Sequence, residues 1–211
     1  GDYMAAGDSK LTICNDALLM LGASEITSFT EGTDSAKICD RLYDDLKKYI
    51  LSIYPWSFAK VKVQLAQTAD TPVTEWRYVY ALPANMIGTP KALFTTSNAG
   101  SLPRAEFELY YVDQPRLLTN YETVYIDHIA DIDESRFPEY FIYMLRHALA
   151  ADIAEPLTDQ ITKADYFRAL AFGSPAENGR GGLFRQAAQA DAQGQRSQTI
   201  GNESFDLIEV R

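Results

Sequence analysis

The densest group of side chains able to do chemistry is an acidic stretch, DHIADIDE, at residues 127–134. Clustered carboxylates are ligands that Ca²⁺ prefers, so the stretch could suggest a calcium loop. An EF-hand loop also needs a glycine at its sharp turn and a distant bidentate glutamate, and this stretch has neither. We therefore interpret it as a solvated strand-to-helix turn, whose acids favour the N-terminus of the next helix, and we expect no metal.

Nucleophilic and acid–base chemistry has few candidates. The chain has two histidines, His128 and His147, and no G-x-S-x-G motif to hold a serine nucleophile on a strained turn. Cys14 and Cys39 lie on the apolar faces of two predicted helices, which favours buried free thiols over a disulfide or a metal site. Two carboxylates could still hydrolyse a glycosidic bond, because the separation that such a pair needs is a spatial fact. With 29 acidic residues in the chain, the sequence singles out no pair.

A glycine-rich segment, NGRGG at residues 178–182, is a candidate for binding phosphate. It lacks the Gly-Lys-Ser/Thr ending of a P-loop and follows a predicted helix rather than a strand, so we interpret it as a linker. We expect the protein to be no enzyme and to hold no cofactor.

Composition and charge indicate a soluble globular protein that does not grip nucleic acid. The 211 residues are 46% hydrophobic and 23% charged, enough for one large domain or a domain with an insert. No apolar run approaches the ~20 residues of a membrane span, and nothing at the N-terminus is typical of a signal peptide. Binding duplex DNA relies on clustered Lys and Arg, which the net charge of −10 argues against, although DNA could slide past an acidic wall.

Helical periodicity opens the chain. Ser9 is the predicted N-cap of a first helix that ends near Leu21, and Pro55 follows the end of a second helix. The second helix has apolar residues three and four apart, which is typical of a helix packed on other helices. These residues are Ala36, Cys39, Tyr43, Leu46, Ile50 and Ile53.

Alternation with a period of two then predicts a small, mainly antiparallel sheet. The alternating residues are Val61, Val63 and Leu65; Trp76, Tyr78, Tyr80 and Leu82; Phe107, Leu109 and Tyr111; and Val124 and Ile126.

Helical periodicity returns at the end of the sheet. We expect Ser135 or the next residue to cap a third helix, central in the bundle, with Pro138 in its first turn and its end at Pro156. Thr158 would cap a fourth helix, and a short fifth helix is predicted for residues 183–193. The residues of the fourth helix that should point inward are Ile161, Ala164, Phe167, Leu170 and Ala171.

The chain ends in a polar, glycine-punctuated tail, residues 194–211, with a small apolar cluster and no helical period. We expect this tail to be an arm that docks on another molecule, because it has no pattern that would bury the cluster on its own body. Its predicted partner-binding residues are Phe205, Leu207, Ile208, Val210 and Arg211, with Glu209 and Arg211 fixing the register.

Together the patterns predict an α+β fold: a helical bundle with an inserted small antiparallel β-sheet domain and an extended C-terminal arm. The bundle is expected at residues 9–56 and 134–193, and the inserted β-rich domain at residues 57–133. The arm is expected at residues 194–211. Residues 1–8 are expected to be a flexible N-terminus, in which residues 1–3 are a cloning remnant.

Four segments resemble, in order, the tail tubular protein A type of head-to-tail adaptor of short-tailed phages. They are residues 13–22 (ICNDALLMLG), 54–59 (YPWSFA), 76–85 (WRYVYALPAN) and 137–158, which begin with FPEYF and end with ALAADIAEPLT. Each motif is weak alone, but together they span nearly the whole chain in the expected order. The glycine-rich break at residues 173–182 departs from the family, which usually continues there in helix.

The resemblance implies a virion structural protein that joins the portal to the tail. Identical subunits would form a ring, expected to be twelvefold, and DNA would pass through it without specific binding. The arm would bind the portal protein, and the tail nozzle protein would bind the far side. We expect a monomer or weak oligomer in isolation, no membrane partner, and a location in the virion, with the host cytoplasm as the place of assembly. Two alternatives remain: a tail-associated cell-wall or polysaccharide hydrolase, and a bacterial domain of prophage origin with a recruited binding role.

Overall fold

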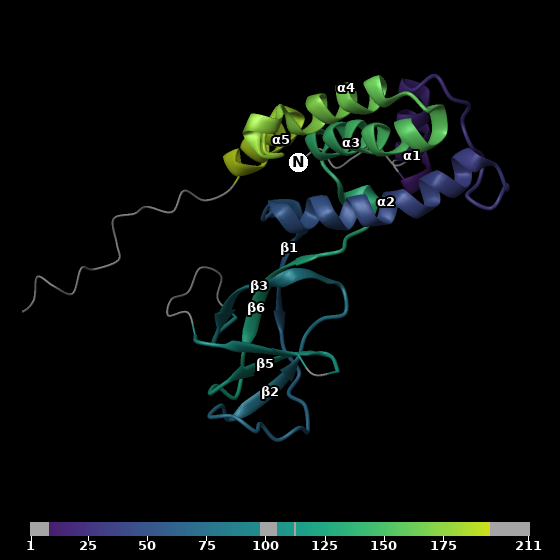
Figure 1. Cartoon of the computed structure of the whole chain (residues 1–211). Coiled ribbons are helices and arrows are strands. Elements are labelled where there is room, and N and C mark those ends of the chain that lie inside the picture. The colour runs from purple at the N-terminus through teal and green to yellow at the C-terminus, as the bar shows by residue number, and fades with distance from the viewer. Residues whose placement is uncertain (1–8, 98–104, 112, 195–211) are drawn as a thin grey trace, which may run out of the picture.

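The computed structural model of the chain describes residues 9–97, 105–111 and 113–194. It has the predicted α+β fold, in which helices begin and end the described chain and the strands lie between them. The helices are α1 (Lys10–Met20), α2 (Asp34–Ile53), α3 (Glu139–Thr158), α4 (Ile161–Phe172) and α5 (Gly182–Gln193). The strands are β1 (Lys60–Gln64), β2 (Tyr78–Ala81), β3 (Met86–Phe94), β4 (Glu108–Tyr111), β5 (Pro115–Thr119) and β6 (Tyr125–Ala130). Figure 1 shows the helices gathered at one end of the molecule and the strands at the other.

Helix α3 is the centre of the bundle, as its two apolar sides predict. It contacts α1, α2, α4 and α5. Its side chains Phe141, Met144, Leu145, Ala148 and Leu149 are all fully buried. Burying aliphatic and aromatic side chains is the main driving force of folding, so the bundle depends on α3 more than on any other helix.

The first two helices begin at the side chains that capping rules favour. The Ser9 hydroxyl accepts a hydrogen bond from the Thr12 backbone N–H at 3.3 Å, which confirms the predicted N-cap. The Thr33 hydroxyl accepts one from the Ala36 N–H, also at 3.3 Å, at the start of α2.

Three predicted helix boundaries near α3 are wrong. Ser135 lies in a 3-10 turn, η2 (Glu134–Arg136), and Pro138 is itself the N-cap residue of α3. Pro156 lies inside α3 rather than ending it, because a proline near the C-terminus of a helix removes one hydrogen bond and the last turn tolerates that loss. Thr158 does not cap α4, since its hydroxyl donates back to the Ala154 carbonyl at 2.5 Å and Gln160 is the N-cap residue.

The orientation of α4 also differs in part from its predicted apolar face. Ala164, Phe167 and Ala171 are buried as expected. Ile161 is 61% exposed and Leu170 is 37% exposed. The inward face of α4 is therefore narrower than the sequence pattern indicated.

The strands form two three-stranded antiparallel sheets, ordered β1-β6-β3 and β2-β5-β4. The sheets are linked where the Ala105 N–H donates to the Leu93 carbonyl and where Gln67 bridges Tyr80. They enclose a second, smaller hydrophobic core. Its buried members are Leu65, Tyr80, Leu93, Leu117, Val124 and Ile126.

Two strands are absent from the predicted set, and one predicted strand is buried on both faces. β3 contains Gly88 and Pro90 and has an irregular register between Ile87 and Ala92, so it carries no regular alternation. β5 is a short strand that begins with a proline. In β2, Val79 and Tyr80 are both buried, since Val79 lies under the segment that precedes the strand.

Candidate functional site

The predicted partner-binding residues, Phe205, Leu207, Ile208, Val210 and Arg211, lie outside the described residues. The described chain ends just after α5, with Gly194 as the C-cap residue of that helix. The candidate arm therefore begins directly at the end of α5, and the structure gives its point of departure.

The end of α5 is held by a buried carboxylate. Asp191 is 1% exposed and accepts hydrogen bonds from the Ser57 N–H at 2.9 Å, the Ser57 hydroxyl at 2.6 Å and the Tyr140 hydroxyl at 2.7 Å. Burial, together with the hydrogen bond to Asp191, raises the pKa of Tyr140, which keeps its hydroxyl a neutral donor. Asp191 thus ties the last turn of α5 to the start of α3 and to the chain that leaves the bundle for the sheets.

That departing chain, residues 54–59, is named here the exit connection. Its Trp56 is fully buried, donates its indole N–H to the Ile50 carbonyl at 2.9 Å, and packs at 5.1 Å from Phe141 and 5.8 Å from Phe184 between ring centres. The Tyr54 hydroxyl donates to the Ala188 carbonyl on α5 at 3.2 Å. Aromatic rings in such tilted arrangements contribute beyond their buried area, so the exit connection is fixed to both α3 and α5.

The returning chain, residues 131–138, is named the return connection and is held by a lysine. The Lys47 ammonium of α2 lies 3.0 Å from Asp131 and 3.1 Å from Glu134, and the Tyr43 hydroxyl donates to Glu134 at 3.1 Å. Burial acts to lower the pKa of Lys47, but the hydrogen bonds and charges of the two carboxylates outweigh it and raise that pKa. Asp131 also donates its N–H to the Asn85 carbonyl at 2.8 Å.

This network corrects the interpretation of the acidic stretch at residues 127–134. Its first four residues belong to strand β6, and Asp131 and Glu134 neutralise Lys47 instead of facing solvent in an open turn. Among the described residues, no group of three or more His, Cys, Asp or Glu side chains is arranged to hold a metal ion.

The other candidates for chemistry lie in structural positions. Cys14 and Cys39 are free, fully buried thiols, as the sequence predicts. The hydrogen bond with Cys39 and burial both raise the pKa of Cys14, so this thiol stays protonated and is a poor nucleophile. His128 is buried with its Nδ1 3.1 Å from the Ile129 carbonyl, and His147 has its Nδ1 2.7 Å from the Tyr143 carbonyl.

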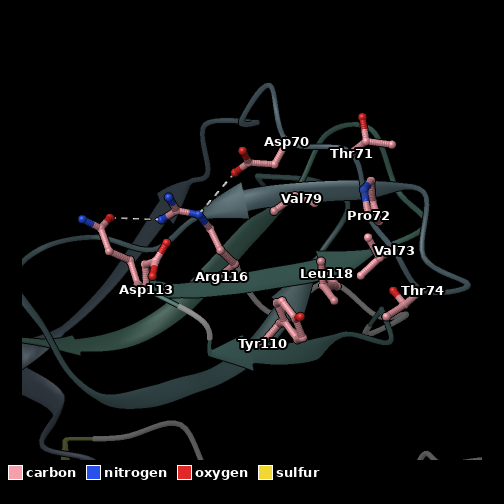
Figure 2. A pocket seen from close by; sticks show the side chains of 11 residues that line it. Asp70, Thr71, Pro72, Val73, Thr74, Val79, Tyr110, Asp113, Arg116 and Leu118 are labelled. Atoms are coloured by element: carbon pink, nitrogen blue, oxygen red, sulfur yellow. Dashed lines mark hydrogen bonds and ion pairs between the residues drawn. The ribbon is translucent and has the colours of Figure 1, made fainter.

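A cavity of about 290 Å³ lies in the sheet region, between the segment of residues 70–74 and strands β2, β5 and β4. Figure 2 shows this segment along one side of the cavity and Tyr110 on the opposite side. Its floor is formed by Val79 and Leu118, which are 5% and 3% exposed and lie opposite each other in the β2–β5 pairing. Since side chains alternate along a strand, this floor is on the face opposite to the core residues Tyr80 and Leu117.

The polar end of the cavity is built around Arg116. The Arg116 Nε lies 3.6 Å from an Asp70 carboxylate oxygen, and its Nη1 donates to the Gln114 side-chain oxygen at 3.2 Å (Figure 2). Asp113 lines the same end. The cavity thus joins an apolar floor to a charged end, an arrangement typical of sites for amphipathic ligands or side chains.

A second hollow, of about 460 Å³, runs between α3 and α5. Ile142 and Ala187 form its buried part, and Tyr143, which is 47% exposed, lies at its rim with Glu139 and Arg146. The Arg146 guanidinium stacks 4.6 Å from the centre of the Tyr143 ring.

The residues that hold the two connections are not identified from the sequence alone, although in each case a charged residue falls on the buried face of a helix. Asp191 follows Phe184 and Ala187 at helical spacing, so it is an acid on the buried face of α5. Lys47 is four residues after Tyr43 and likewise falls on a buried face. The partners could not be predicted, because Ser57 is 134 residues from Asp191 and Lys47 is 87 residues from Glu134.

Among the described helices, none is both long and apolar enough to cross a membrane. Comparison of the chain with models of known protein families and with curated protein sequences gives no match.

Proposed function

We propose that this protein is a virion structural protein, a head-to-tail adaptor that joins the portal to the tail of a short-tailed phage. The observation that carries the proposal is the ordered set of four motifs that resemble such adaptors. Residues 13–22 lie mostly in α1, residues 54–59 form the exit connection, residues 76–85 include β2, and residues 137–158 include α3.

The way in which the exit and return connections are held in place supports this function on physical grounds. An adaptor must keep one partner at a fixed position relative to another, so its two parts should not swing freely. Here each of the two chains that cross between bundle and sheets is held by a buried charged residue, Asp191 on one side and Lys47 on the other. Ion pairs and hydrogen bonds of this kind hold the segments that they join in one arrangement.

In this proposal, subunits assemble into a ring of twelve below the portal protein, and the tail nozzle protein binds the opposite side. The arm at residues 194–211 binds the portal through Phe205, Leu207, Ile208 and Val210. One arm binds weakly, but many arms on one ring raise the overall affinity by 10²–10⁴, roughly, through effective concentration. The net charge of −10 is consistent with DNA that passes through the ring without being gripped. The protein acts in the virion at the head–tail interface after assembly in the host cytoplasm.

Deleting residues 194–211 tests the proposal. We expect portal binding to fall by about 100-fold or more, because avidity depends on every arm. The free energy of unfolding of the monomer should change by less than about 0.5 kcal/mol, because in this proposal the arm buries its apolar side chains on the portal and not on its own subunit. Binding is measured by sedimentation with purified portal rings, and unfolding by urea titration.

A matched variant separates the apolar cluster from chain length. The full-length chain with Phe205, Leu207, Ile208 and Val210 changed to serine should bind the portal as poorly as the deletion. If either variant binds the portal as well as the unchanged protein, or if the deletion unfolds the monomer, the arm is not a portal anchor.

A further inference from the structure

The sheet end of the molecule, defined as residues 66–82, 105–111 and 113–122, carries several exposed apolar side chains close together in the fold. Val73 is 85% exposed, Tyr110 39%, Tyr111 63% and Tyr121 46%. Tyrosines are enriched at protein interfaces, where they form well-packed anchors. The cavity beside Arg116 opens among these residues, since Val73 and Tyr110 line it.

The charge of this end is strongly negative. It contains the six acids Asp70, Glu75, Glu106, Glu108, Asp113 and Glu122 and the two bases Arg77 and Arg116, which gives a net charge of −4. A partner with basic side chains would be attracted to this surface and oriented on it.

The charged groups at the polar end of the cavity include one carboxylate more than Arg116 can balance. Arg116 is accompanied by Asp70 at 3.6 Å and by the Gln114 side chain at 3.2 Å, and Asp70 also accepts a hydrogen bond from the Thr68 hydroxyl at 3.0 Å. Asp113 makes no ion pair or side-chain hydrogen bond with any residue that the structure describes. The charge of Arg116 is thus balanced by Asp70, and the Asp113 carboxylate remains for a ligand.

We propose that this cavity is a docking site for an arginine or lysine side chain presented by a protein partner. The aliphatic stem lies on Val79 and Leu118, as long basic side chains lie on apolar surfaces while their charge stays near water. The cation pairs with Asp113 at the polar end, and the Tyr110 ring at the cavity wall adds a cation–π contact. The inference goes beyond the adaptor function and uses no residue of the arm, so either can fail without the other.

The test uses a short peptide with one central arginine, Ac-Gly-Thr-Val-Arg-Val-Thr-Gly-NH₂, and its twin with citrulline in place of arginine. Citrulline has nearly the same shape and hydrogen-bonding groups but no charge. Binding to the full-length protein is followed through the backbone amide resonances of ¹⁵N-labelled protein. We expect the arginine peptide to bind with a Kd of about 1 mM, which corresponds to roughly 4 kcal/mol. Its largest shifts should be at Val79, Tyr110 and Leu118.

Asp113→Asn should weaken binding about fivefold, as expected for the loss of one exposed ion pair, and the citrulline peptide should be weaker by a similar factor. Glu75→Gln makes the same charge change at the sheet end but outside the cavity lining, and it should leave the affinity within about twofold. Because Asp113 is exposed, its variant is expected to fold, and the amide spectrum checks this directly.

Three results would overturn the proposal. The citrulline peptide could bind as tightly as the arginine peptide, which would make the cavity a site for neutral ligands. The affinity could be unchanged in Asp113→Asn, or the shifts could map to the hollow between α3 and α5 or to no defined surface.

Discussion

The exit and return connections join the same two parts of the molecule, yet they bury charge in opposite ways. The exit connection is held by a carboxylate, Asp191, which accepts hydrogen bonds from the neutral donors of Ser57 and Tyr140. The return connection is held by a cation, Lys47, between the carboxylates of Asp131 and Glu134. Neutral groups thus donate hydrogen bonds to the carboxylate of Asp191, whereas carboxylates of opposite charge surround the ammonium of Lys47.

This difference predicts how strongly each connection responds to mutation and to salt. Asp191 is 1% exposed, so added salt should screen its interactions little, but removing the carboxylate leaves its hydrogen-bond donors without their acceptor. An ion pair is weakened by any exposure to water, and the side chains of Asp131 and Glu134 are 32% and 16% exposed. We therefore expect that disrupting the exit connection lowers the free energy of unfolding more than disrupting the return connection does. We also expect that this loss depends less on salt.

The largest effect should come from Asp191→Ala. It should lower the free energy of unfolding by about 2–3 kcal/mol, because it leaves the Ser57 N–H and the Tyr140 hydroxyl without their acceptor and opens a small void. Urea unfolding measures the change. Asp165→Ala, at an exposed position of α4, is the control and should change stability by less than about 0.5 kcal/mol.

Asp191→Asn sharpens the same prediction. The amide keeps one acceptor oxygen but lacks the charge that strengthens all three hydrogen bonds. The free energy of unfolding of Asp191→Asn should therefore lie between that of the unchanged protein and that of Asp191→Ala. If Asp191→Ala lowers the free energy of unfolding no more than the Asp165→Ala control does, Asp191 does not hold the exit connection in place.

A smaller effect is expected for Lys47→Met, which keeps the stem and removes the cation. Breaking a buried pair leaves two carboxylates without compensation, but their partial exposure reduces the cost to about 1–2 kcal/mol. In 1 M NaCl the difference from the unchanged protein should shrink, because salt screens partly exposed charges. Asp191→Ala should keep its full effect at that salt concentration, and equal salt dependence of the two variants would remove the distinction between the connections.

The pH dependence of Lys47 follows from the direction of its pKa. Because that pKa is raised above its usual 10.5 in the folded protein, the stabilisation by Lys47 is complete below pH 10.5 and is lost as the pH rises through the folded value. The stability difference between the unchanged protein and Lys47→Met should therefore be constant between pH 7 and 9 and should decrease in more alkaline solution.

The sequence predicts the bundle well because local patterns specify it. Ser9 caps α1, and the stripe from Ala36 to Ile50 identifies α2 and its buried face, since periodicity and capping act within a few residues. The fold class follows from the change of period between the helices and the strands.

The parts that the sequence does not predict depend on distant contacts or on irregular backbone. β3 carries Gly88 and Pro90, which break the alternation on which strand prediction depends. Pro156 was expected to end α3, but local rules cannot weigh the packing of the last turn against one lost hydrogen bond. The cavity around Arg116 requires the pairing of β2, β5 and β4, and the sequence indicates neither the strand β5 nor the segment that covers it.

The smallest effect concerns one more carboxylate, Glu31, which extends the comparison from the two connections to an exposed site. Glu31, in the connection between α1 and α2, accepts hydrogen bonds from the Thr33 hydroxyl at 2.6 Å and from the N–H and hydroxyl of Thr27 at 2.8 and 2.9 Å. The hydrogen bond from Thr33, followed by those from Thr27, lowers the pKa of Glu31 to about 2. A lowered pKa means that the charged form stabilises the fold above the ordinary value of 4.5 and that this contribution is lost as the pH falls toward 2.

Glu31→Gln should therefore destabilise the protein at pH 7 by less than either connection variant, since the site is fully open to water. The difference should fade between about pH 4.5 and pH 2, where the unchanged protein loses the same charge. Thermal unfolding followed by circular dichroism at steps across this range measures it, with Glu25→Gln as the control at an exposed acid of the same connection. If the difference stayed constant down to pH 2, the carboxylate charge would not be what holds the connection.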